Sequence, residues 1–364
     1  MATKATIVEV PGPDGLREVR VSSPDRVVYE ATDRTPEVTK LQVCEYFAAV
    51  GEGLMRACRD RPVALERWPS GWREGMTLST AANGQPQNGE GFYSKRLPKG
   101  APEWIRTTRV SSPNGRPIDE LTLAEPAAAV WAAQMGALTL HPWAVRAADV
   151  EHPDELRIDL DPQPGTGFAE ARRVALLARD VLAGLGVRAF AKTSGNRGVH
   201  VYVRIEPRWT FEEVRHAAIG LGRELERLDD GVTTAWWKEE RGERLFVDFN
   251  QNNRDRTIAG AWSLRPRPGA PVSTPLSWEA LAEIDDPRSL NLFTVPGLLR
   301  QGDPWAEIDD VAHSLDPLLE LWERLPGGEL NFPPDYPKMP GEPPRVQPSK
   351  KVADNWDEHG RRIE

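Results

Sequence analysis

The sequence predicts an α/β fold of the α+β kind, in which one compact unit carries a sheet that is not all parallel. Segments with the character of a strand, a helix, a hairpin, a helix and a strand follow one another over residues 155–250. A separate set of short strands and helices precedes them, over about residues 1–150. A chain of 364 residues is long enough for two such cores.

The composition is that of a soluble globular protein. No apolar run is long enough to span a membrane, and the first residues lack the apolar stretch of a signal peptide. Cys44 and Cys58 are the only cysteines, too few for a disulfide framework or a zinc cluster, so we expect a reducing cytoplasm. The net charge of -9 does not indicate nucleic-acid binding, but a basic face and metal-binding carboxylates can coexist with it.

The first elements are a hairpin and a helix. Residues 5–21 predict the hairpin, because apolar and polar residues alternate on either side of a Pro- and Gly-rich turn. Thr35 is the expected N-cap of a helix that begins at Pro36 and continues to about Asp60. A strand is expected at 63–68.

The next segment begins with a long polar loop. Residues 70–91 are rich in Gly, Asn, Gln and Ser and have no periodicity. A strand at 105–110 follows it, and Thr122 with Glu125 predicts a capping box for an Ala-rich helix. A short strand at 138–143 ends this part of the chain.

The central unit alternates strands and amphipathic helices. A helix is expected at 168–185, strands at 187–192 and 199–205, and a second helix opened by the capping box at 210–213. Another strand is expected at 245–249.

The last segments are punctuated by proline, with helices expected near 277–284, 289–299 and 314–324. The expected organisation is a first part over about 1–150, a second over about 151–300, a helical extension at 301–325, and an extended or disordered tail at 326–364.

Two aspartates share one face of the strand at 156–162. Asp159 and Asp161 are two residues apart, so their side chains point the same way, about 7 Å apart along the strand. Two like charges are costly to bury unless a cation joins them, which favours a divalent metal held by oxygen ligands. The alternative is a solvent-facing Asp pair at the end of a surface strand.

Asp248 supplies a third carboxylate, within the apolar strand Leu-Phe-Val-Asp-Phe. Two aspartates from one strand and one from another can hold two divalent ions, which suits phosphoryl transfer. The alternative is that Asp248 pairs with an arginine such as Arg244 or Arg265.

The segment at 192–200 combines a tight Gly-flanked turn with side-chain donors. Exposed backbone N–H groups and Lys192, Ser194, Arg197 and His200 suit a polyphosphate. Taken alone, a Gly-rich hairpin with solvated charges is the commoner explanation.

Two polar segments have ordinary explanations of equal or greater weight. The bases and amides at 251–257, Gln251 among them, lie beside the proposed metal site, although a polar loop is the commoner explanation for the segment taken alone. Phe92 and Tyr93 stand beside bases, as in sites for unpaired nucleotides, although they could also pack on the core.

Five motifs in a fixed order resemble the primase–polymerase domain of the bacterial end-joining ligase D, within the archaeo-eukaryotic primase superfamily. They are Leu-His-Pro-Trp at 140–143, Ile-Asp-Leu-Asp-Pro at 158–162, Lys-Thr-Ser-Gly-Asn-Arg-Gly-Val-His-Val-Tyr at 192–202, Phe-Val-Asp-Phe-Asn-Gln-Asn at 246–252 and Ser-Leu-Arg-Pro-Arg-Pro-Gly-Ala-Pro-Val-Ser at 263–273. The resemblance covers most of residues 22–300. It implies a primase–polymerase over 1–300, with an RRM-like mixed sheet packed against a second, N-terminal α/β sheet unit.

The resemblance also implies roles for individual residues. Asp159, Asp161 and Asp248 would be catalytic and would bind two ions of Mn²⁺ or Mg²⁺. The expected nucleotide-binding residues are His141 (near the sugar), Lys192, Ser194, Arg197, His200, Gln251, Arg265 and the stacking pair Phe92 and Tyr93. The expected contacts to DNA and its 5′-phosphate are Arg26, Lys40, Arg67, Lys238 and Arg241.

Three features depart from the family pattern. Glu66 stands where the family has a basic residue, and Arg197 replaces a lysine of the Gly-rich turn. The loop at 70–91 looks longer than usual. No ligase or nuclease sequence accompanies the polymerase, so the chain resembles a stand-alone member, as found in actinobacteria.

The expected function is therefore a template-dependent nucleotidyltransferase, a metal-dependent DNA polymerase or primase acting in DNA repair. It would add nucleotides, with ribonucleotides preferred, to primer 3′-ends at short gaps or broken ends that carry a 5′-phosphate. Ku and a separate DNA ligase are expected partners in the bacterial cytoplasm near the nucleoid. The alternatives are a sugar-nucleotide glycosyltransferase, which also places an Asp-x-Asp after a strand, and a non-catalytic DNA-end-binding module.

Overall fold

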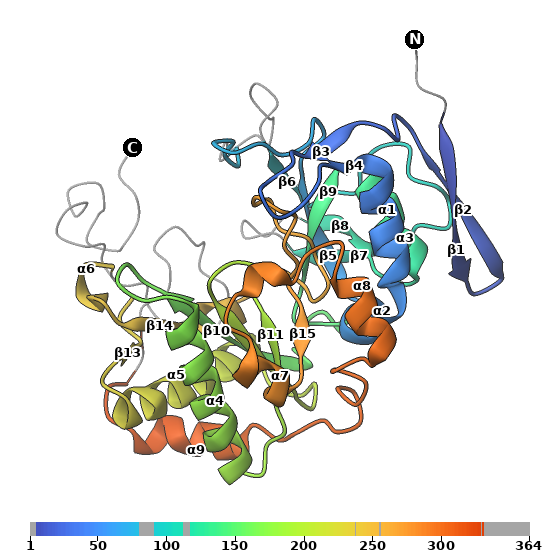
Figure 1. The fold of residues 1–364 in the computed structure, drawn as a ribbon. Helices are drawn as coiled ribbons and strands as arrows, with labels where there is room; N and C mark the ends of the chain where they lie inside the picture. Colours follow the sequence, from blue (N-terminus) through green and yellow to red (C-terminus); the bar gives the residue numbers. More distant parts are fainter. Residues whose placement is uncertain are drawn as a thin grey trace, which may run out of the picture.

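The computed structural model describes residues 5–79, 91–111, 117–236, 238–254, 256–328 and 330. Two units with separate sheets lie side by side, and the last helix runs along the second unit (Figure 1). This arrangement confirms the predicted α+β fold class, with a mixed sheet in the second unit.

The N-terminal unit is built on an antiparallel sheet in the order β6-β5-β8-β7, with β9 also paired to β5. A separate hairpin and a cluster of helices cover it. Its elements are β1 (Thr6–Gly12), β2 (Gly15–Val21), β3 (Val27–Tyr29), β4 (Val38–Thr39), α1 (Lys40–Ala49), α2 (Gly51–Cys58), β5 (Pro62–Arg67), β6 (Phe92–Ser94), β7 (Thr107–Ser111), β8 (Pro117–Thr122), α3 (Pro126–Gln134) and β9 (Ala137–Pro142).

The first helix begins later than the sequence predicted. Thr39, not Thr35, is its N-cap, and Thr39 and Gln42 form a capping box. The hydroxyl of Thr35 is engaged with that of Thr32 at 2.9 Å, so it is not available to cap a helix. The predicted single helix is also divided at Val50, where α1 ends and α2 begins.

The predicted capping box at Thr122 and Glu125 is also wrong. Thr122 is the last residue of β8, and its hydroxyl is hydrogen-bonded to that of Thr108 at 2.7 Å. Glu125 is itself the N-cap of α3 but makes no side-chain cap bond, because its carboxylate accepts from Arg17.

The second unit is a sheet in the order β13-β14-β10-β12-β11-β15, in which only β13 and β14 are parallel. Helices α4 and α5 pack against β10 and against each other, so they cover the same face. Its elements are β10 (Glu155–Pro162), α4 (Phe168–Gly184), β11 (Phe190–Thr193), β12 (Val199–Arg204), α5 (Phe211–Leu228), β13 (Val232–Thr233), α6 (Lys238–Arg241), β14 (Leu245–Asp248), the 3-10 helix η1 (Phe249–Asn252) and β15 (Pro275–Leu276).

The second half of β10 alternates as the sequence predicted, whereas Glu155 and Arg157 in its first half are buried along with the apolar residues. Leu156, Ile158 and Leu160 are fully buried, whereas Asp159 is half-buried and Asp161 is exposed. Since α4 and α5 cover the apolar face, the aspartates lie on the opposite face of the sheet.

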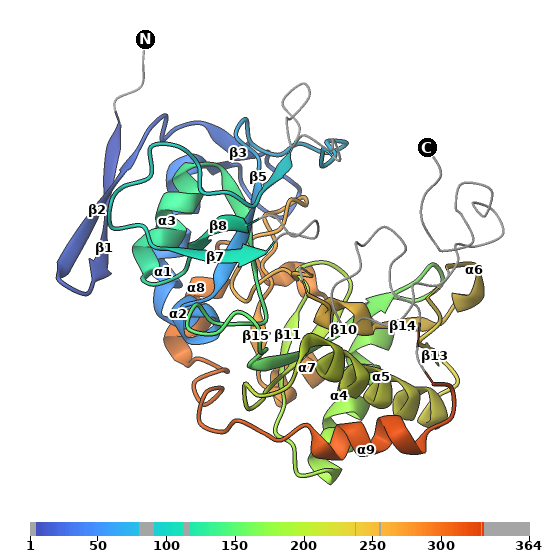
Figure 2. The ribbon, with the colours of Figure 1, turned by 180° about the vertical axis from the view of Figure 1, so that it is seen from behind.

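The C-terminal part packs onto both units. It comprises α7 (Trp278–Glu283), η2 (Pro287–Ser289), α8 (Val295–Gln301) and α9 (Asp316–Arg324). Helix α9 runs against α5, as the reverse view shows (Figure 2). Helix α8 lies beside α2 of the N-terminal unit (Figure 1). Between α8 and α9, Trp305 is buried and its Nε1 donates to the carbonyl of Ala191 on β11 at 3.0 Å.

Much of the predicted loop at 70–91, and nearly all of the predicted tail at 326–364, lie outside the described residues. Of the helices that the structure describes, none combines the length and apolar character needed to cross a bilayer.

Candidate active site

The sheet register of the second unit brings the predicted acidic residues to one place. Asp159 on β10 is the direct partner of Asp248 on β14, and its partner on the other side is His200 on β12. Directly opposed residues project on the same face, with Cβ atoms about 5 Å apart. Asp161 lies on that face two residues further along β10.

The surroundings of Asp159 and Asp248 disfavour the ionised form of both carboxylates. Burial raises the pKa of Asp159 well above its usual value, and the charges of Asp248 and Asp161 raise it further. Burial also raises the pKa of Asp248, although a hydrogen bond from Gln251 opposes this. Close acidic oxygens of this kind match the hard ligands that Mg²⁺ or Mn²⁺ prefers, so the donor chemistry fits the expected metals.

Side-chain amides hold the carboxylates of Asp161 and Asp248, and the acidic side chains do not point toward one common metal position. Asp161 Oδ2 accepts from Gln163 Nε2 at 3.0 Å, and Asp248 Oδ2 accepts from Gln251 Nε2 at 2.8 Å. Across the residues that the structure describes, no group of three His, Cys, Asp or Glu side chains is arranged to hold a metal ion. Gln251, expected to contact a nucleotide, is thus engaged with Asp248.

The Gly-rich turn lies at the end of β10 beside the aspartates. Ser194 Oγ accepts from the backbone N–H groups of Asn196 and Gly198 at 3.2 and 3.0 Å, and Arg197 Nη2 lies 3.4 Å from the carbonyl of Pro162. Gly195 has a φ of +71°, and a Cβ there would lie 2.5 Å from Cγ of Arg265. Only glycine therefore lets Arg265 lie across the turn.

Lys192 is buried behind His200. Its Nζ lies 2.7 Å from His200 Nδ1 and 2.5 Å from Ser273 Oγ, and the side chain is fully buried. Burial lowers the pKa of Lys192 well below its usual value. Nε2 of His200 lies 3.4 Å from Asp159 Oδ1. Lys192 thus holds His200 beside Asp159 and is not exposed to a ligand.

A second group of predicted residues lies on the N-terminal sheet. His141 on β9 and Tyr93 on β6 share one face of β5, and their rings meet edge to face with centroids 5.2 Å apart. Phe92 points to the other face, where the Arg67 guanidinium lies 5.1 Å above its ring. The structure therefore does not bring the expected stacking pair to one face.

Arg265 links the two groups. Its charge acts on Asp159, Lys192 and His200 in the second unit, and on Tyr93 and His141 in the first. Among the described residues, its buried Nε has no hydrogen-bond partner. The hydroxyl of Tyr29, which the sequence did not identify, donates to the Arg265 carbonyl at 2.9 Å.

Two expected phosphate-binding residues line one cavity. Arg26 and Lys40 border a cavity of about 200 Å³ together with Ser22, Trp68 and Gln134. Lys40 is buried, and its Nζ donates to the Ser22 carbonyl at 2.9 Å. Burial lowers the pKa of Lys40. Arg67 directly precedes Trp68 of this cavity. Its Nε is already engaged, since it donates to the Met135 carbonyl at 2.9 Å.

The remaining expected DNA contacts lie on α6. Lys238 is exposed, whereas Arg241 is buried with its guanidinium 3.4 Å from the ring centroid of Phe246. Arg241 Nη1 also donates to Gln163 Oε1 at 3.1 Å, and Gln163 holds Asp161. Arg241 therefore supports the acidic site from behind.

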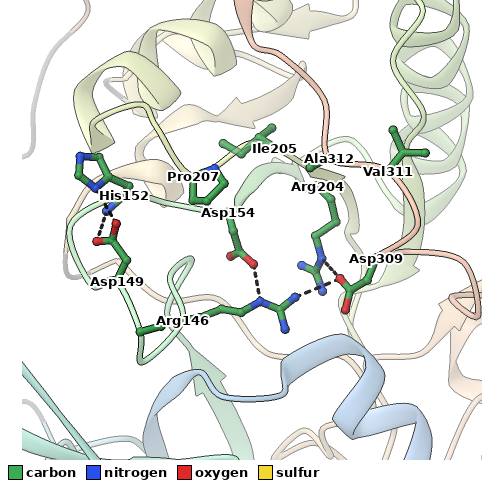
Figure 3. Close-up of a pocket in the computed structure, with 11 residues that line it drawn as sticks. Arg146, Asp149, His152, Asp154, Arg204, Ile205, Pro207, Asp309, Val311 and Ala312 are labelled. Atoms are coloured by element: carbon green, nitrogen blue, oxygen red, sulfur yellow. Dashed lines mark hydrogen bonds and ion pairs between the residues drawn. The ribbon is translucent and has the colours of Figure 1, made fainter.

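Another cavity, of about 440 Å³, contains none of the predicted residues (Figure 3). Asp309 bridges Arg146 and Arg204 across it, with N···O distances of 3.0 and 2.6 Å. Its charged groups pair with one another, so we interpret them as structural. Asp154 in this cavity precedes β10, whereas Asp159 and Asp161 lie toward the other end of that strand.

Comparisons with known proteins relate the chain to one family of DNA repair polymerases. A family model described as "LigD, primase-polymerase domain" matches residues 39–305. The chain is 32% identical over 294 residues to the multifunctional non-homologous end joining protein LigD of Pseudomonas aeruginosa, covering 79% of this chain and 32% of that protein. It is 30% identical over 321 residues to the LigD of Mycobacterium tuberculosis H37Rv, covering 83% of this chain and 38% of that protein.

The fold has a solved counterpart. The polymerase domain of Mycobacterium tuberculosis ligase D, solved in complex with DNA, matches with a TM-score of 0.68 and 26% identity, covering 81% of this chain and 99% of that domain. The chain thus spans about a third of the length of these relatives but 99% of the solved polymerase domain. By its matching model, its relatives and its fold, this chain belongs to the LigD primase-polymerase domain family.

Proposed function

We propose that this chain is a template-dependent nucleotidyltransferase that adds nucleotides to primer 3′-ends. The observation that carries the proposal is the direct pairing of Asp159 with Asp248, next to the Gly-rich turn of Ser194. Acidic ligands beside a turn that carries the Ser194 hydroxyl and the exposed Arg197 guanidinium suit transfer between phosphate oxygens.

Asp159, Asp161 and Asp248 would hold two divalent ions, Mn²⁺ or Mg²⁺. Bound ions would activate the primer 3′-hydroxyl and stabilise the charge of the transferred phosphate. A modest rotation of Asp161 and Asp248 away from Gln163 and Gln251 would free the oxygens that those amides now hold.

The nucleotide is expected between the two units. The Ser194 hydroxyl, the exposed Arg197 side chain and the Arg265 guanidinium supply donors for the triphosphate. His141 would face the sugar, and the half-exposed ring of Tyr93 would stack on the base or the template. His200, fixed by Lys192, would complete the phosphate site from the side of Asp159.

The DNA is expected to extend over the N-terminal unit. Arg26 and Lys40 share a cavity that suits a 5′-phosphate on the far side of a gap, with Arg67 nearby on β5. The exposed Lys238 on α6 would contact the backbone near the acidic site. We propose gap filling and end joining in DNA repair, with ribonucleotides preferred and with Ku and a DNA ligase as partners.

Primer extension on a gapped duplex tests this function. We expect Mn²⁺-dependent extension by the wild type and none by Asp159→Ala. Extension that survives Asp159→Ala, or a wild type that extends nothing, would refute the proposal. Salt-sensitive DNA binding that Asp159→Ala leaves unchanged, without any incorporation, would indicate an end-binding module. Transfer from a UDP-sugar without any effect of DNA would indicate a glycosyltransferase.

A further inference from the structure

Glu66 is a buried carboxylate at the position where the family pattern has a basic residue. It lies on β5 directly opposite Tyr93 on β6, and on the same sheet face as His141 on β9. Only 2% of Glu66 is exposed. A buried carboxylate is costly unless each oxygen is hydrogen-bonded, so the partners of its two oxygens reveal what it does.

Both oxygens of Glu66 accept hydrogen bonds. Oε1 accepts from the indole Nε1 of Trp68 at 3.1 Å, and Oε2 lies 3.0 Å from Nε2 of His141. An indole nitrogen can only donate, so Trp68 fixes the carboxylate with its other oxygen toward the imidazole. Burial acts to raise the pKa of Glu66, but the bonds from His141 and Trp68 and the charge of Arg265 lower it overall.

An ionised carboxylate fixes the tautomer of the histidine that it contacts. Because Glu66 has no proton to give, the N–H of His141 lies on Nε2, and Nδ1 keeps its lone pair. Burial lowers the pKa of His141 despite the opposing effect of Glu66, which favours the neutral ring. Within the part of the chain that the structure describes, Nδ1 has no hydrogen-bond partner.

We propose that Glu66 is a positioning residue that makes Nδ1 of His141 an acceptor for a hydroxyl of the nucleotide sugar, and so raises the preference for ribonucleotides. This inference rests on the proposed function, in which His141 faces the sugar. A ribonucleotide offers a 2′-hydroxyl to an acceptor there, whereas a deoxynucleotide leaves the acceptor unpaired.

Glu66→Gln tests this role with almost no change in volume. Trp68 would still donate to the amide oxygen, so the amide N–H₂ would face His141 Nε2 and move the ring proton to Nδ1. We expect ¹⁵N-labelled histidine spectra to show His141 protonated at Nε2 in the wild type and at Nδ1 in Glu66→Gln. His141→Gln assigns the resonance among the six histidines.

The kinetic readout is the ratio of ribonucleotide to deoxynucleotide incorporation at a one-nucleotide gap. We expect Glu66→Gln to lower this ratio about twofold to tenfold, the range covered by one hydrogen bond, with deoxynucleotide incorporation nearly unchanged. Glu120→Gln is the matched control, since Glu120 is a buried carboxylate on the neighbouring strand β8 that likewise accepts from an indole, Nε1 of Trp143, at 2.9 Å. Its ratio should stay near that of the wild type.

Several results would overturn the inference. An unchanged His141 tautomer in Glu66→Gln, an equal loss for both sugars, or an equal fall of the ratio in Glu120→Gln would each reduce Glu66 to a packing residue. If the wild type extends with both sugars but the ratio does not move, only this inference fails. If the wild type extends with neither, the proposed function fails and the sugar role with it, although the tautomer measurement still reports on Glu66.

Discussion

Asp159 lies directly opposite Asp248 across two antiparallel strands, and burial together with the neighbouring charges raises the pKa of Asp159 well above its usual value. Such a pair destabilises the folded protein unless a cation joins the two carboxylates. The acidic site therefore lowers the free energy of unfolding of the metal-free protein, as is common in binding and catalytic sites.

Asp159→Asn should make the metal-free protein more stable by about 1 kcal/mol, because it removes one of the repelling charges. Mn²⁺ should stabilise the wild type, by about 2.7 kcal/mol at a hundredfold excess over Kd, and should not stabilise the variant. Thermal unfolding with and without Mn²⁺ measures both effects. A variant that is less stable than the wild type without metal, or that Mn²⁺ still stabilises, would contradict the assignment of the site.

Arg26→Gln and Lys40→Met should weaken binding to gapped DNA that carries a 5′-phosphate by roughly tenfold or more each, because each removes a charged donor from the cavity they share. Binding to the same duplex with a 5′-hydroxyl should barely change. Fluorescence anisotropy at several salt concentrations measures both. Arg227→Ala, an exposed charge at the end of α5, is the matched control. Equal losses of affinity for the two duplexes would show that the cavity does not bind the 5′-phosphate.

Glu155→Gln should destabilise the protein by about 3–5 kcal/mol, because Arg61, Arg157 and Arg204 would lose a buried ionised partner. Urea unfolding measures the change. Glu206→Gln serves as the control, since its pair with Arg208 is exposed and should contribute less than about 1 kcal/mol. Similar losses in the two variants would show that burial of the cluster matters little.

The same cluster should make the protein sensitive to acid. Burial acts to raise the pKa values of Asp154, Glu155 and Asp309, but the surrounding arginines lower all three overall. Carboxylates with lowered pKa values stabilise the fold above their unfolded pKa values of about 4, and this stability is lost as the pH falls through the folded values. Unfolding measured from pH 5 downward should show a shallower loss in Glu155→Gln than in the wild type. Parallel curves would contradict this origin of the acid sensitivity.

Local pattern was enough to predict many elements of the fold. The alternation of apolar and polar residues in the first hairpin and in the second half of β10, and the capping box of α5, are confirmed. The helix starts at Thr35 and Thr122 are wrong because each hydroxyl bonds another threonine in the folded chain. A threonine before a helix-like pattern does not show which partner its hydroxyl will find.

The candidate site was predictable only in part, because register and burial depend on distant residues. The motifs indicated Asp159, Asp248 and His200, and the sheet makes them neighbours. Nothing local shows that Lys192 is buried behind His200, or that Glu66 contacts His141, 75 residues away in sequence. Phe92 and Tyr93 were predicted as a pair, but consecutive residues of a strand must diverge.

Asp309 is held at once by Arg146, from the loop after β9, and by Arg204, from the end of β12. It therefore connects the two units through ion pairs at a point remote from the acidic site. Because about half of the Asp309 side chain is exposed, dissolved ions screen its ion pairs with the two arginines. The strength of this contact between the units should thus depend on ionic strength, and protein stability measured at several salt concentrations without DNA would show it.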